Sequence, residues 1–358
     1  MQIMREVFFG KRVFLTGHTG FKGTWLTMIL NKMGAEVMGY SLEPNTVPAM
    51  YNVLNADRYC KSVIGDIRNR ELLEKSILEF EPDFVFHLAA QPIVRTSYNI
   101  PVDTFEINTI GTVNLLDTLR FLEKPCVAVM ITTDKVYRNN ETGQAYNEND
   151  PFGGYDPYSA SKAAAEIVID SYRNSFFNPK DYDKHHKSIA STRAGNVIGG
   201  GDWAADRLVP DIVRALSVEK PVNIRNPKAV RPWQHVLEPL IGYLTLAAKI
   251  YQSPTSFNEG YNFGPNSADV TTVGEMAQMG VDIWGKGLLE FPEQINQPHE
   301  AGLLSLDITK AETELGWKPK MNARKALDMT LRWYKAYYQG DDMAAFTNLQ
   351  IEDYLMNL

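Results

Sequence analysis

Two short segments of the chain carry side chains suited to acid–base chemistry on an alcohol. The first is Thr132-Thr133-Asp134-Lys135, and the second runs from Tyr158 to Lys162 with the sequence YSASK. A tyrosine and a lysine four residues apart lie on one face of a helix, where the ammonium can lower the pKa of the phenol. A phenolate can take the proton of an alcohol, which hydride removal from the alcohol carbon requires. The spacing therefore predicts a base at Tyr158.

A glycine-rich segment near the N-terminus has the pattern of a site for the cofactor that such a pair would need. Arg12–Thr16 is a short apolar run typical of a buried strand, and Gly17, Gly20 and Gly23 follow before a helical pattern begins. Glycines at this point let the backbone turn tightly and approach a pyrophosphate at a helix N-terminus. The spacing G-x-x-G-x-x-G differs from the usual G-x-G-x-x-G. An ordinary strand-to-helix turn is the alternative, but the order of strand, glycines and helix favours a dinucleotide site.

Several motifs resemble those of the extended short-chain dehydrogenase/reductase superfamily, and the resemblance covers nearly the whole chain. Thr16–Gly23 matches the cofactor turn of that family, and Gly65–Arg68 looks like its adenine-contacting segment. His87–Gln91 is similar to the motif that follows a strand beside the cofactor, and Asn108–Thr112 to a helical Asn and Gly. Within the superfamily the chain is most similar to the nucleotide-sugar 4,6-dehydratases.

The resemblance implies a bound NAD. The residues that it places at the cofactor are Gly17, His18, Thr19, Gly20, Phe21, Lys22, Gly23, Asp66, Ile67, Leu88, Ala89, Ala90, Gln91, Asn108, Thr132, Tyr158 and Lys162. His18 could instead fill a tolerant loop position. At the place where NAD-preferring members carry an acid, the chain has Ser41, with Glu43 slightly later. The absence of an Arg cluster favours NAD over NADP, and the missing acid predicts looser retention of the cofactor.

The resemblance also implies a set of catalytic residues. Tyr158 and Lys162 match the catalytic pair of the family, Thr133 takes the place of the third hydroxyl, and Asp134 is the mark of the dehydratases. The implied reaction oxidises C4 of a glucose, eliminates water across C5 and C6, and returns the hydride to C6. Asp134, kept protonated by burial, would give its proton to the departing O6. Lys135 could be the C5 base, could stabilise an enolate, or could be a structural ammonium paired with Asp134.

Position 135 separates branches of the family. Members that act on dTDP-glucose or GDP-mannose carry a glutamate there, whereas this chain has Lys135. Lys135 and the segments Gly199–Trp203 and Arg231–Pro239 resemble the motifs of the branch that acts on CDP-glucose. The resemblance implies a role in the synthesis of deoxysugars such as those of lipopolysaccharide O-antigen. Three alternatives stay open, namely the same reaction on another nucleotide sugar, a 4-epimerase, and a non-catalytic NAD-binding scaffold.

The substrate side has fewer patterned residues. The candidates are Arg95, Asn196, Trp203, Arg207, Arg231 and Glu300, with Asn99 as a further cleft residue. A guanidinium at Arg207 or Arg231 could clamp a diphosphate. Asn196 could touch the diphosphate or cap a turn, and Trp203 could stack on the base or fill the space between two domains.

Composition sets limits on the function. A net charge of −7 on 358 residues argues against a nucleic-acid surface or a polybasic membrane surface. Cys60 and Cys126 are too few for a disulfide framework, which points to a reducing compartment. No signal peptide, membrane-spanning run or metal-ligand spacing stands out, so we expect a soluble cytoplasmic enzyme without a metal.

Alternating strand and helix patterns predict an α/β fold, a Rossmann-type doubly wound parallel sheet with a smaller mixed C-terminal substrate domain. The expected domains are 1–190 for NAD, with a return segment near 228–255, and 191–227 with 256–358 for the sugar nucleotide. Superfamily members pair two helices with those of a partner, so the predicted helices Thr104–Leu122 and Tyr158–Phe176 imply a homodimer through a four-helix seam. The expected strands are Arg12–Thr16, Glu36–Tyr40, Ser62–Gly65, Asp83–Leu88, Val127–Thr133 and Ile189–Arg193.

Overall fold

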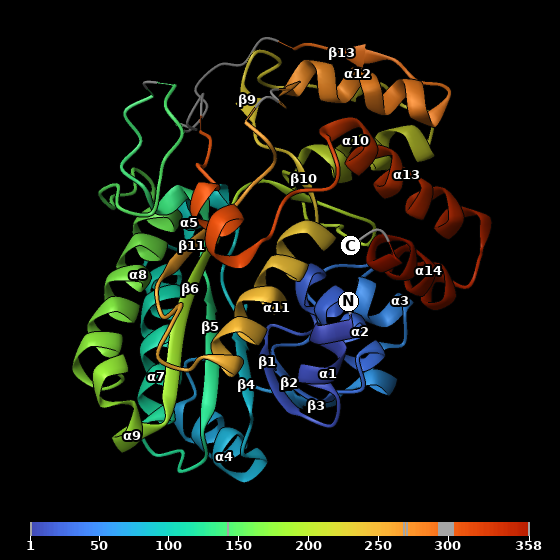
Figure 1. Ribbon diagram of the computed structural model, residues 1–358. Helices are drawn as coiled ribbons and strands as arrows, with labels where there is room; N and C mark the ends of the chain where they lie inside the picture. The colour runs from blue at the N-terminus through green and yellow to red at the C-terminus, as the bar shows by residue number, and fades with distance from the viewer. Residues whose placement is uncertain (1, 142, 268, 270, 293–303, 357–358) are drawn as a thin grey trace.

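A seven-stranded parallel sheet forms the centre of the computed structural model, which describes residues 2–141, 143–267, 269, 271–292 and 304–356 (Figure 1). The strand order is β11-β6-β5-β4-β1-β2-β3, and every neighbouring pair is parallel. The strands are β1 (Arg12–Thr16), β2 (Glu36–Ser41), β3 (Lys61–Ile64), β4 (Phe84–His87), β5 (Cys126–Ile131), β6 (Lys187–Ala194) and β11 (Gly260–Phe263).

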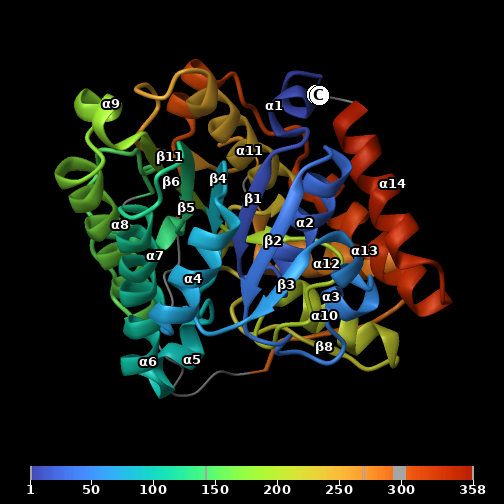
Figure 2. The same ribbon diagram turned by 90° about the horizontal axis from the view of Figure 1, so that it is seen from below.

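The central strands are apolar because helices cover both faces of the sheet. All residues of β4, β5, β6 and β11 are buried, as expected for a parallel sheet between two helical layers. Figure 2 shows α4, α7 and α8 on one side of the sheet and α1 and α11 on the other. The helices of the two layers are α1 (Gln2–Phe8), α2 (Phe21–Lys32), α4 (Arg70–Phe80), α7 (Gly111–Leu119), α8 (Pro157–Ser175) and α11 (Leu237–Gln252).

The helix that carries the tyrosine–lysine pair has a well-defined start. Asp156 caps α8, because its carboxylate accepts from the backbone amide of Ser159 at 2.9 Å, and Pro157 occupies the first helical position. Tyr158 is the second residue of the helix and Lys162 follows about one turn later, and both are buried. The cap therefore sets where the pair stands relative to the end of β5.

Shorter elements build a smaller lobe above the carboxyl ends of the strands (Figure 1). Its helices α10, α12 and α13 pack on one another, and Thr272 begins α12 with a capping box closed by Glu275. The other α-helices and strands are α3 (Met50–Val53), α5 (Val94–Asn99), α6 (Pro101–Phe105), α9 (Tyr182–His185), β7 (Val197–Ile198), α10 (Leu208–Ser217), β8 (Val222–Asn223), β9 (Val230–Arg231), β10 (Gln234–His235), β12 (Thr271–Thr272), α12 (Val273–Trp284), β13 (Leu289–Glu290), α13 (Ala323–Gln339) and α14 (Met343–Met356).

The predicted parallel α/β fold is confirmed, and all six expected strands are present with ends shifted by at most two residues. The prediction of one continuous helix over Thr104–Leu122 is wrong in detail, because this stretch is divided into three segments. It consists of α6, a π-helical turn at Glu106–Ile110 and α7. The sequence also missed β11, the last strand of the sheet, which carries only four residues between polar turns.

The division into domains stays a prediction, and β11 is the point where it needs revision. Gly260–Phe263 pairs with β6 in the central sheet, although the expected boundary places it in the second domain. Among the described residues, no helix is long and apolar enough to cross a membrane.

Candidate active site

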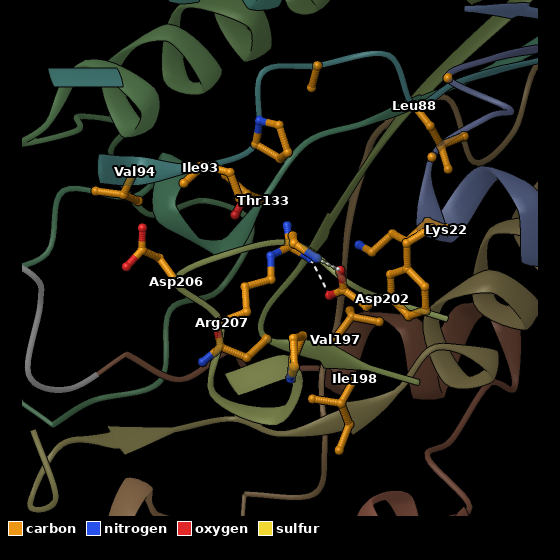
Figure 3. A pocket seen from close by; sticks show the side chains of 18 of the residues that line it. Lys22, Leu88, Ile93, Val94, Thr133, Val197, Ile198, Asp202, Asp206 and Arg207 are labelled. Atoms are coloured by element: carbon orange, nitrogen blue, oxygen red, sulfur yellow. Dashed lines mark hydrogen bonds and ion pairs between the residues drawn. The ribbon is translucent and has the colours of Figure 1, made fainter. Parts of the chain in front are cut away.

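A cavity of about 560 Å³ lies beyond the carboxyl ends of the strands, where ligands bind in open parallel sheets. Its walls come from the glycine turn, from the ends of β2 to β6, and from segment 194–231 of the smaller lobe. Figure 3 shows Lys22 and Leu88 toward one end and Val94 and Asp206 toward the other, with Thr133 and Arg207 between them. The cavity therefore extends from the glycine turn, past Thr133, to the segment that carries Asp206.

The turn between β1 and α2 has the shape of a phosphate site. Gly17 has φ +77°, and a Cβ there would lie 2.9 Å from the backbone nitrogen of Ala89. A Cβ on Gly23 would lie 2.1 Å from the carbonyl oxygen of Gly17, so both positions need glycine. No side chain caps α2 at Gly20, and Gly20, Phe21 and Lys22 line the cavity. The first amides of this helix can thus bind a diphosphate.

The end of the cavity near β2 suits an adenosine without a 2′-phosphate. The Thr19 hydroxyl lies 2.9 Å from the Ser41 hydroxyl and donates to the carbonyl of Leu42 at 2.8 Å. The described lining around Ser41 and Asp66 (Tyr40, Leu42, Asn45, Thr46, Gly65, Ile67) contains neither arginine nor lysine. Asp66 accepts from Arg68 at 2.8 Å, and that ion pair lowers the pKa of Asp66. This end therefore fits NAD better than NADP.

Four of the predicted catalytic side chains meet at the middle of the cavity. Thr133, Asp134, Tyr158 and Lys162 all line it and are all buried. The Thr133 hydroxyl donates to Oδ1 of Asp134 at 2.9 Å, and Lys162 Nζ donates to the carbonyl oxygen of Ile131 at 3.2 Å. The end of β5 and the start of α8 bring these residues together, as the sequence predicted.

Burial dominates the charges of this cluster. It raises the pKa of Tyr158 to about 12, although a hydrogen bond with Thr133 and the charge of Arg207 lower it. Burial likewise lowers the pKa of Lys162 to about 8. The expectation that the ammonium of Lys162 brings the phenol pKa toward neutrality is therefore wrong for the protein by itself, because desolvation of the phenolate outweighs the nearby cations.

Asp134 has the environment of a proton donor. Burial raises the pKa of its carboxyl group, while the charge of Lys135 and the hydrogen bond from Thr133 lower it. Its second oxygen, Oδ2, lies close to Gly195, because a Cβ there would stand 2.9 Å away. Gly195 was not among the sequence candidates, and its only signal was the turn Arg193-Ala-Gly-Asn after β6.

A buried ion pair lies directly beneath the catalytic cluster. Glu166, one helical turn after Lys162, accepts from Arg193 Nε at 2.9 Å and from the Thr132 hydroxyl at 2.5 Å. Ser191 adds a third donor at 2.8 Å. These bonds lower the pKa of Glu166 despite its burial. The carboxylate thus anchors the backbone that carries Thr133 and Asp134, a role that the sequence did not reveal.

Lys22 reaches the chemical centre as well as the glycine turn. Burial, with the charges of Arg207 and Lys162, lowers the pKa of Lys22 to about 8, although the charges of Asp134 and Asp202 raise it. Figure 3 shows its side chain extending toward Arg207 and Asp202. The sequence placed Lys22 only at the cofactor, so its closeness to the catalytic groups is new.

The substrate candidates are spread along the rest of the cavity. Arg207 donates to Oδ2 of Asp202 at 2.9 Å, and Asn196 and Arg231 also line the wall. Arg95 comes from α5, with its Nε 3.9 Å from Asp206. Further lining residues were missed because they lie in turns or in a two-residue strand without a clear sequence pattern, namely Asp202, Asp206, Asn223, Arg225 and Asn226.

Trp203 mainly fills the space within the smaller lobe. Although it touches the cavity, it is buried, and its ring centroid lies 5.5 Å from that of Trp333 and 5.1 Å from that of Tyr337. The packing alternative that the sequence left open is thus the better description of this side chain.

Three predicted cofactor residues do not line the cavity, and the expectation of direct contact needs correction for them. His18 is buried against Ser62 at 2.7 Å, and burial lowers its pKa to about 4. Asn108 bonds Gln91 through both backbone groups, with its Oδ1 accepting from the amide at 2.8 Å. These side chains support the loop instead of facing a ligand. Asn99 does not line the cavity either, and Glu300 lies outside the described residues.

Within the described part of the chain, no group of three or more His, Cys, Asp or Glu side chains could hold a metal ion. The arrangement instead combines an anion-binding turn, a buried carboxyl group with a raised pKa, and a tyrosine–lysine pair. These are the parts needed to oxidise an alcohol and to protonate a leaving hydroxyl.

Known proteins are similar to this chain in sequence. The model of the family described as GDP-mannose 4,6 dehydratase matches residues 14–330. A relative named CDP-glucose 4,6-dehydratase, from Salmonella typhimurium, is 49% identical over 346 residues, which cover 97% of this chain and 96% of the relative.

Solved structures share its fold. A dTDP-glucose 4,6-dehydratase from Streptomyces venezuelae with NAD bound has a TM-score of 0.77 at 24% identity and covers 92% of this chain and 99% of its own. A UDP-glucose 4-epimerase from Thermus thermophilus in complex with NAD has a TM-score of 0.76 at 25% identity, with coverages of 90% and 99%. The family model spans most of the chain, and the chain belongs to the GDP-mannose 4,6-dehydratase family.

Proposed function

We propose that this protein is an NAD-dependent CDP-glucose 4,6-dehydratase, which converts CDP-glucose to CDP-4-dehydro-6-deoxy-D-glucose and water. The relative that carries this name matches the chain almost from end to end. The observation that carries the proposal is the buried Asp134, hydrogen-bonded to Thr133 in the same cluster as Tyr158 and Lys162. A 4-epimerase needs a tyrosine–lysine pair, whereas only a dehydratase needs an acid for O6.

Each catalytic residue then has one task. Tyr158 takes the proton of O4, and Thr133 donates to O4 while Lys162 stabilises the phenolate. Asp134 is buried and its carboxyl pKa is raised, so it can hold the proton that O6 takes when it leaves as water. NAD, when bound in the glycine turn, supplies a hydride acceptor for C4 and the source of the hydride that returns to C6.

Lys135 is our candidate for the group that handles the C5 proton. It lines the cavity directly after Asp134, and its charge lowers the pKa of that carboxyl group. As an ammonium it can stabilise the enolate that forms when C5 loses its proton, and as a neutral amine it can take that proton. Lys135→Ala assayed in deuterium oxide should lose both dehydration and exchange at C5, and unchanged exchange would contradict this role.

The middle and far parts of the cavity would hold the nucleotide. Arg207, Arg231 and Asn196 all line the cavity and would present donors to a diphosphate. The far end, at Asp206 and Arg225, would receive the cytidine. Under this proposal the second domain binds the sugar nucleotide, and the product serves deoxysugar synthesis such as that of O-antigen.

A homodimer and a cytoplasmic location also belong to the proposal. Side chains on the outer faces of the helices around α7 and α8 are apolar and exposed, with Ile110 at 50% and Ile167 at 59%, which fits a helical seam. Ile167→Glu should give monomers in light scattering, and a dimer unaffected by that change would contradict the seam. Both cysteines are free thiols, as in a reducing compartment.

The first experiment is an incubation of the protein with NAD and, separately, with CDP-, dTDP-, GDP- and UDP-glucose. The mass of each product is read, and Tyr158→Phe is the control for background reaction. Loss of one water from CDP-glucose alone is expected. Loss from another sugar would keep the reaction and change the nucleotide, and no loss from any of them would contradict a dehydratase.

A further inference from the structure

The turn that carries the proposed acid has few bonds of its own. Asp134 begins a three-residue 3₁₀ turn that ends at Val136, and the amide of Tyr137 donates to the carbonyl oxygen of Asp134 at 3.5 Å. The hydrogen bonds of such a turn have poorer geometry than those of an α-helix. The position of the Asp134 carboxyl group therefore depends on what holds the residues on either side of the turn, Thr132 and Tyr137.

One buried ion pair binds both of these residues. Glu166 of α8 and Arg193 of β6 are 2% and 4% exposed. Nε and Nη2 of Arg193 donate to the two carboxylate oxygens of Glu166 at 2.9 and 3.1 Å. Before the turn, the Thr132 hydroxyl donates to Oε1 of Glu166 at 2.5 Å. After the turn, Nη1 of Arg193 donates to the Tyr137 hydroxyl at 2.7 Å. The ion pair thus holds the catalytic turn at both ends.

The side chain of Tyr137 is also fixed from the opposite side. Its hydroxyl donates to Oδ1 of Asn262 in β11 at 2.7 Å, and the side-chain amide of Asn262 donates to the carbonyl oxygens of Tyr146 and Asp307 at 2.9 and 3.1 Å. Tyr137 is 1% exposed and is not among the residues that line the cavity. Any effect of its hydroxyl on the reaction therefore passes through the turn.

A buried ion pair of this kind contributes more to geometry than to stability. Removing two charges from water is costly, and apolar side chains of similar volume often stabilise a protein equally well. The bidentate bonds between a guanidinium and a carboxylate are directional, however, and restrict the groups that they bind. Glu166 also accepts from the Ser191 hydroxyl at 2.8 Å. That bond fixes the carboxylate from β6 and does not hold the turn directly.

We propose that the Glu166–Arg193 ion pair positions Asp134 for protonation of the departing O6, and that Tyr137 is a positioning residue in this arrangement. The inference rests on the proposed function, because only the elimination of water needs the acid. Glu166, Arg193 and Tyr137 are not among the cavity-lining residues, so they act through the turn and not on the substrate. A displacement of about 1 Å at the reacting group can lower the rate about 100-fold.

Tyr137→Phe tests the proposal, because it removes one oxygen atom and keeps the ring. With the NAD-loaded protein and CDP-glucose, we expect kcat to fall by about 10- to 100-fold and KM to stay unchanged. Elimination should slow more than oxidation at C4, so reduced NAD should accumulate on the variant to a higher level than on the wild type. The absorbance of reduced NAD measures this. Loss of stability alone would reduce the number of active molecules without causing that accumulation.

Ser191→Ala is the matched control. It removes a buried hydrogen bond to the same carboxylate but leaves the bonds of Thr132 and Tyr137 in place. Its kcat should equal that of the wild type, even if its Tm falls as far as that of Tyr137→Phe. An equal fall of kcat in both variants, or a wild-type kcat in Tyr137→Phe, would overturn the positioning role.

A second variant covers the case in which Tyr137→Phe does not fold, as judged by circular dichroism. Thr132→Val releases the other end of the turn from Glu166 and keeps the shape of the side chain. The same comparison then applies, with the affinity for NAD measured as well because Thr132 lines the cavity. The wild-type protein separates the two levels of inference. If it forms no product from CDP-glucose, the proposed function fails, whereas an active wild type matched by an equally active variant removes only the positioning role.

Discussion

The two halves of the cavity wall are built in different ways. The catalytic half stands on β5 and α8, long regular elements fixed by a buried carboxylate that binds Thr132 and Arg193. The substrate half, between residues 194 and 231, consists of helix α10, two-residue strands and turns, with ion pairs such as Arg207–Asp202 and Arg225–Asp206. In the first half Thr133, Asp134, Tyr158 and Lys162 are buried, whereas the second relies on long, partly exposed side chains such as those of Arg207 and Arg225.

This difference suggests that the catalytic half determines the reaction rate and the substrate half determines which nucleotide is recognised. Bond-making steps depend on positions held to a fraction of an ångström, which a buried network provides. Recognition of one nucleotide among several depends on side chains in turns, which can change without disturbing the sheet. Substitutions in the catalytic half should therefore lower kcat, and substitutions in the substrate half should mainly raise KM.

The largest effect is expected for Asp134→Asn. The amide keeps the size of the side chain and can still accept from Thr133, but it has no proton of suitable acidity for O6. Water loss from CDP-glucose should fall by about 10²- to 10⁴-fold, the range for a general acid, while oxidation at C4 stays possible. Product mass and the absorbance of reduced NAD measure the two steps, and dehydration at the normal rate would show that Asp134 is not the acid.

A smaller loss of activity is expected when a substitution at Gly195 moves the Asp134 side chain but leaves its carboxyl group in place as an acid. A Cβ in Gly195→Ala would lie 2.9 Å from Oδ2 of Asp134 and 2.9 Å from Cγ of Pro232, so the carboxyl group has to move. A shift of about 1 Å can cost about 100-fold in rate, and we expect kcat to fall by about 10- to 100-fold with KM little changed.

Gly264→Ala is the matched control for that variant. Its Cβ would meet Ile308 and Leu306 at 3.6 Å, an ordinary packing distance, at a site away from the cavity. It should keep the wild-type kcat. An equal fall of kcat in both variants would mean that any added methyl group disturbs the sheet, and the special role of the Gly195 position would then be lost.

The sequence predicted the catalytic half better than the substrate half, for a physical reason. Strand β1, the glycine turn and α4 were found at or near their observed bounds, because buried strands and capped helices leave strong local patterns. Tyr158 and Lys162 were placed on one helical face by spacing alone. These contacts are local in the chain, or follow from the order of parallel strands.

Contacts between distant segments could not be read from the sequence. The pairing of Glu166 with Arg193, and of Asp206 with Arg225, depends on which turns meet in space. His18 shows the converse, because a motif position suggested a cofactor contact while the fold turned the ring toward Ser62. The pKa of Tyr158 was misjudged for the same reason, since desolvation depends on packing and not on spacing.

The substrate half can be tested through Arg207. Arg207→Gln removes a charged donor next to the proposed diphosphate site, and a hydrogen bond to a charged group contributes about 1.5–3 kcal/mol. We expect KM for CDP-glucose to rise by about 10- to 100-fold. The change in kcat should be smaller, although Arg207 also lowers the pKa of Tyr158. Steady-state kinetics separate the two constants.

Arg332→Gln is the control for the loss of one positive charge. Arg332 lies on α13, with its exposed side chain paired to Asp328 at 2.9 Å, far from the cavity lining. Its KM should equal that of the wild type. A fall of kcat with unchanged KM in Arg207→Gln would move Arg207 from the substrate half to the catalytic half.

The smallest expected effect is a gain in stability from Asp134→Asn. Burial raises the pKa of Asp134 in the fold, so the folded protein binds the proton more tightly than the unfolded chain. Stability from this group is therefore present at acid pH and is lost as the pH rises through the unfolded and then the folded pKa. The asparagine variant avoids this loss, so at neutral pH its Tm should exceed that of the wild type. The shift should be about 1–2 °C for each kcal/mol gained in the free energy of unfolding. The difference should shrink toward pH 4 in thermal unfolding scans. A variant less stable than the wild type at neutral pH would mean that the Asp134 carboxyl group stabilises the fold. Burying this catalytic acid would then not lower the stability of the protein.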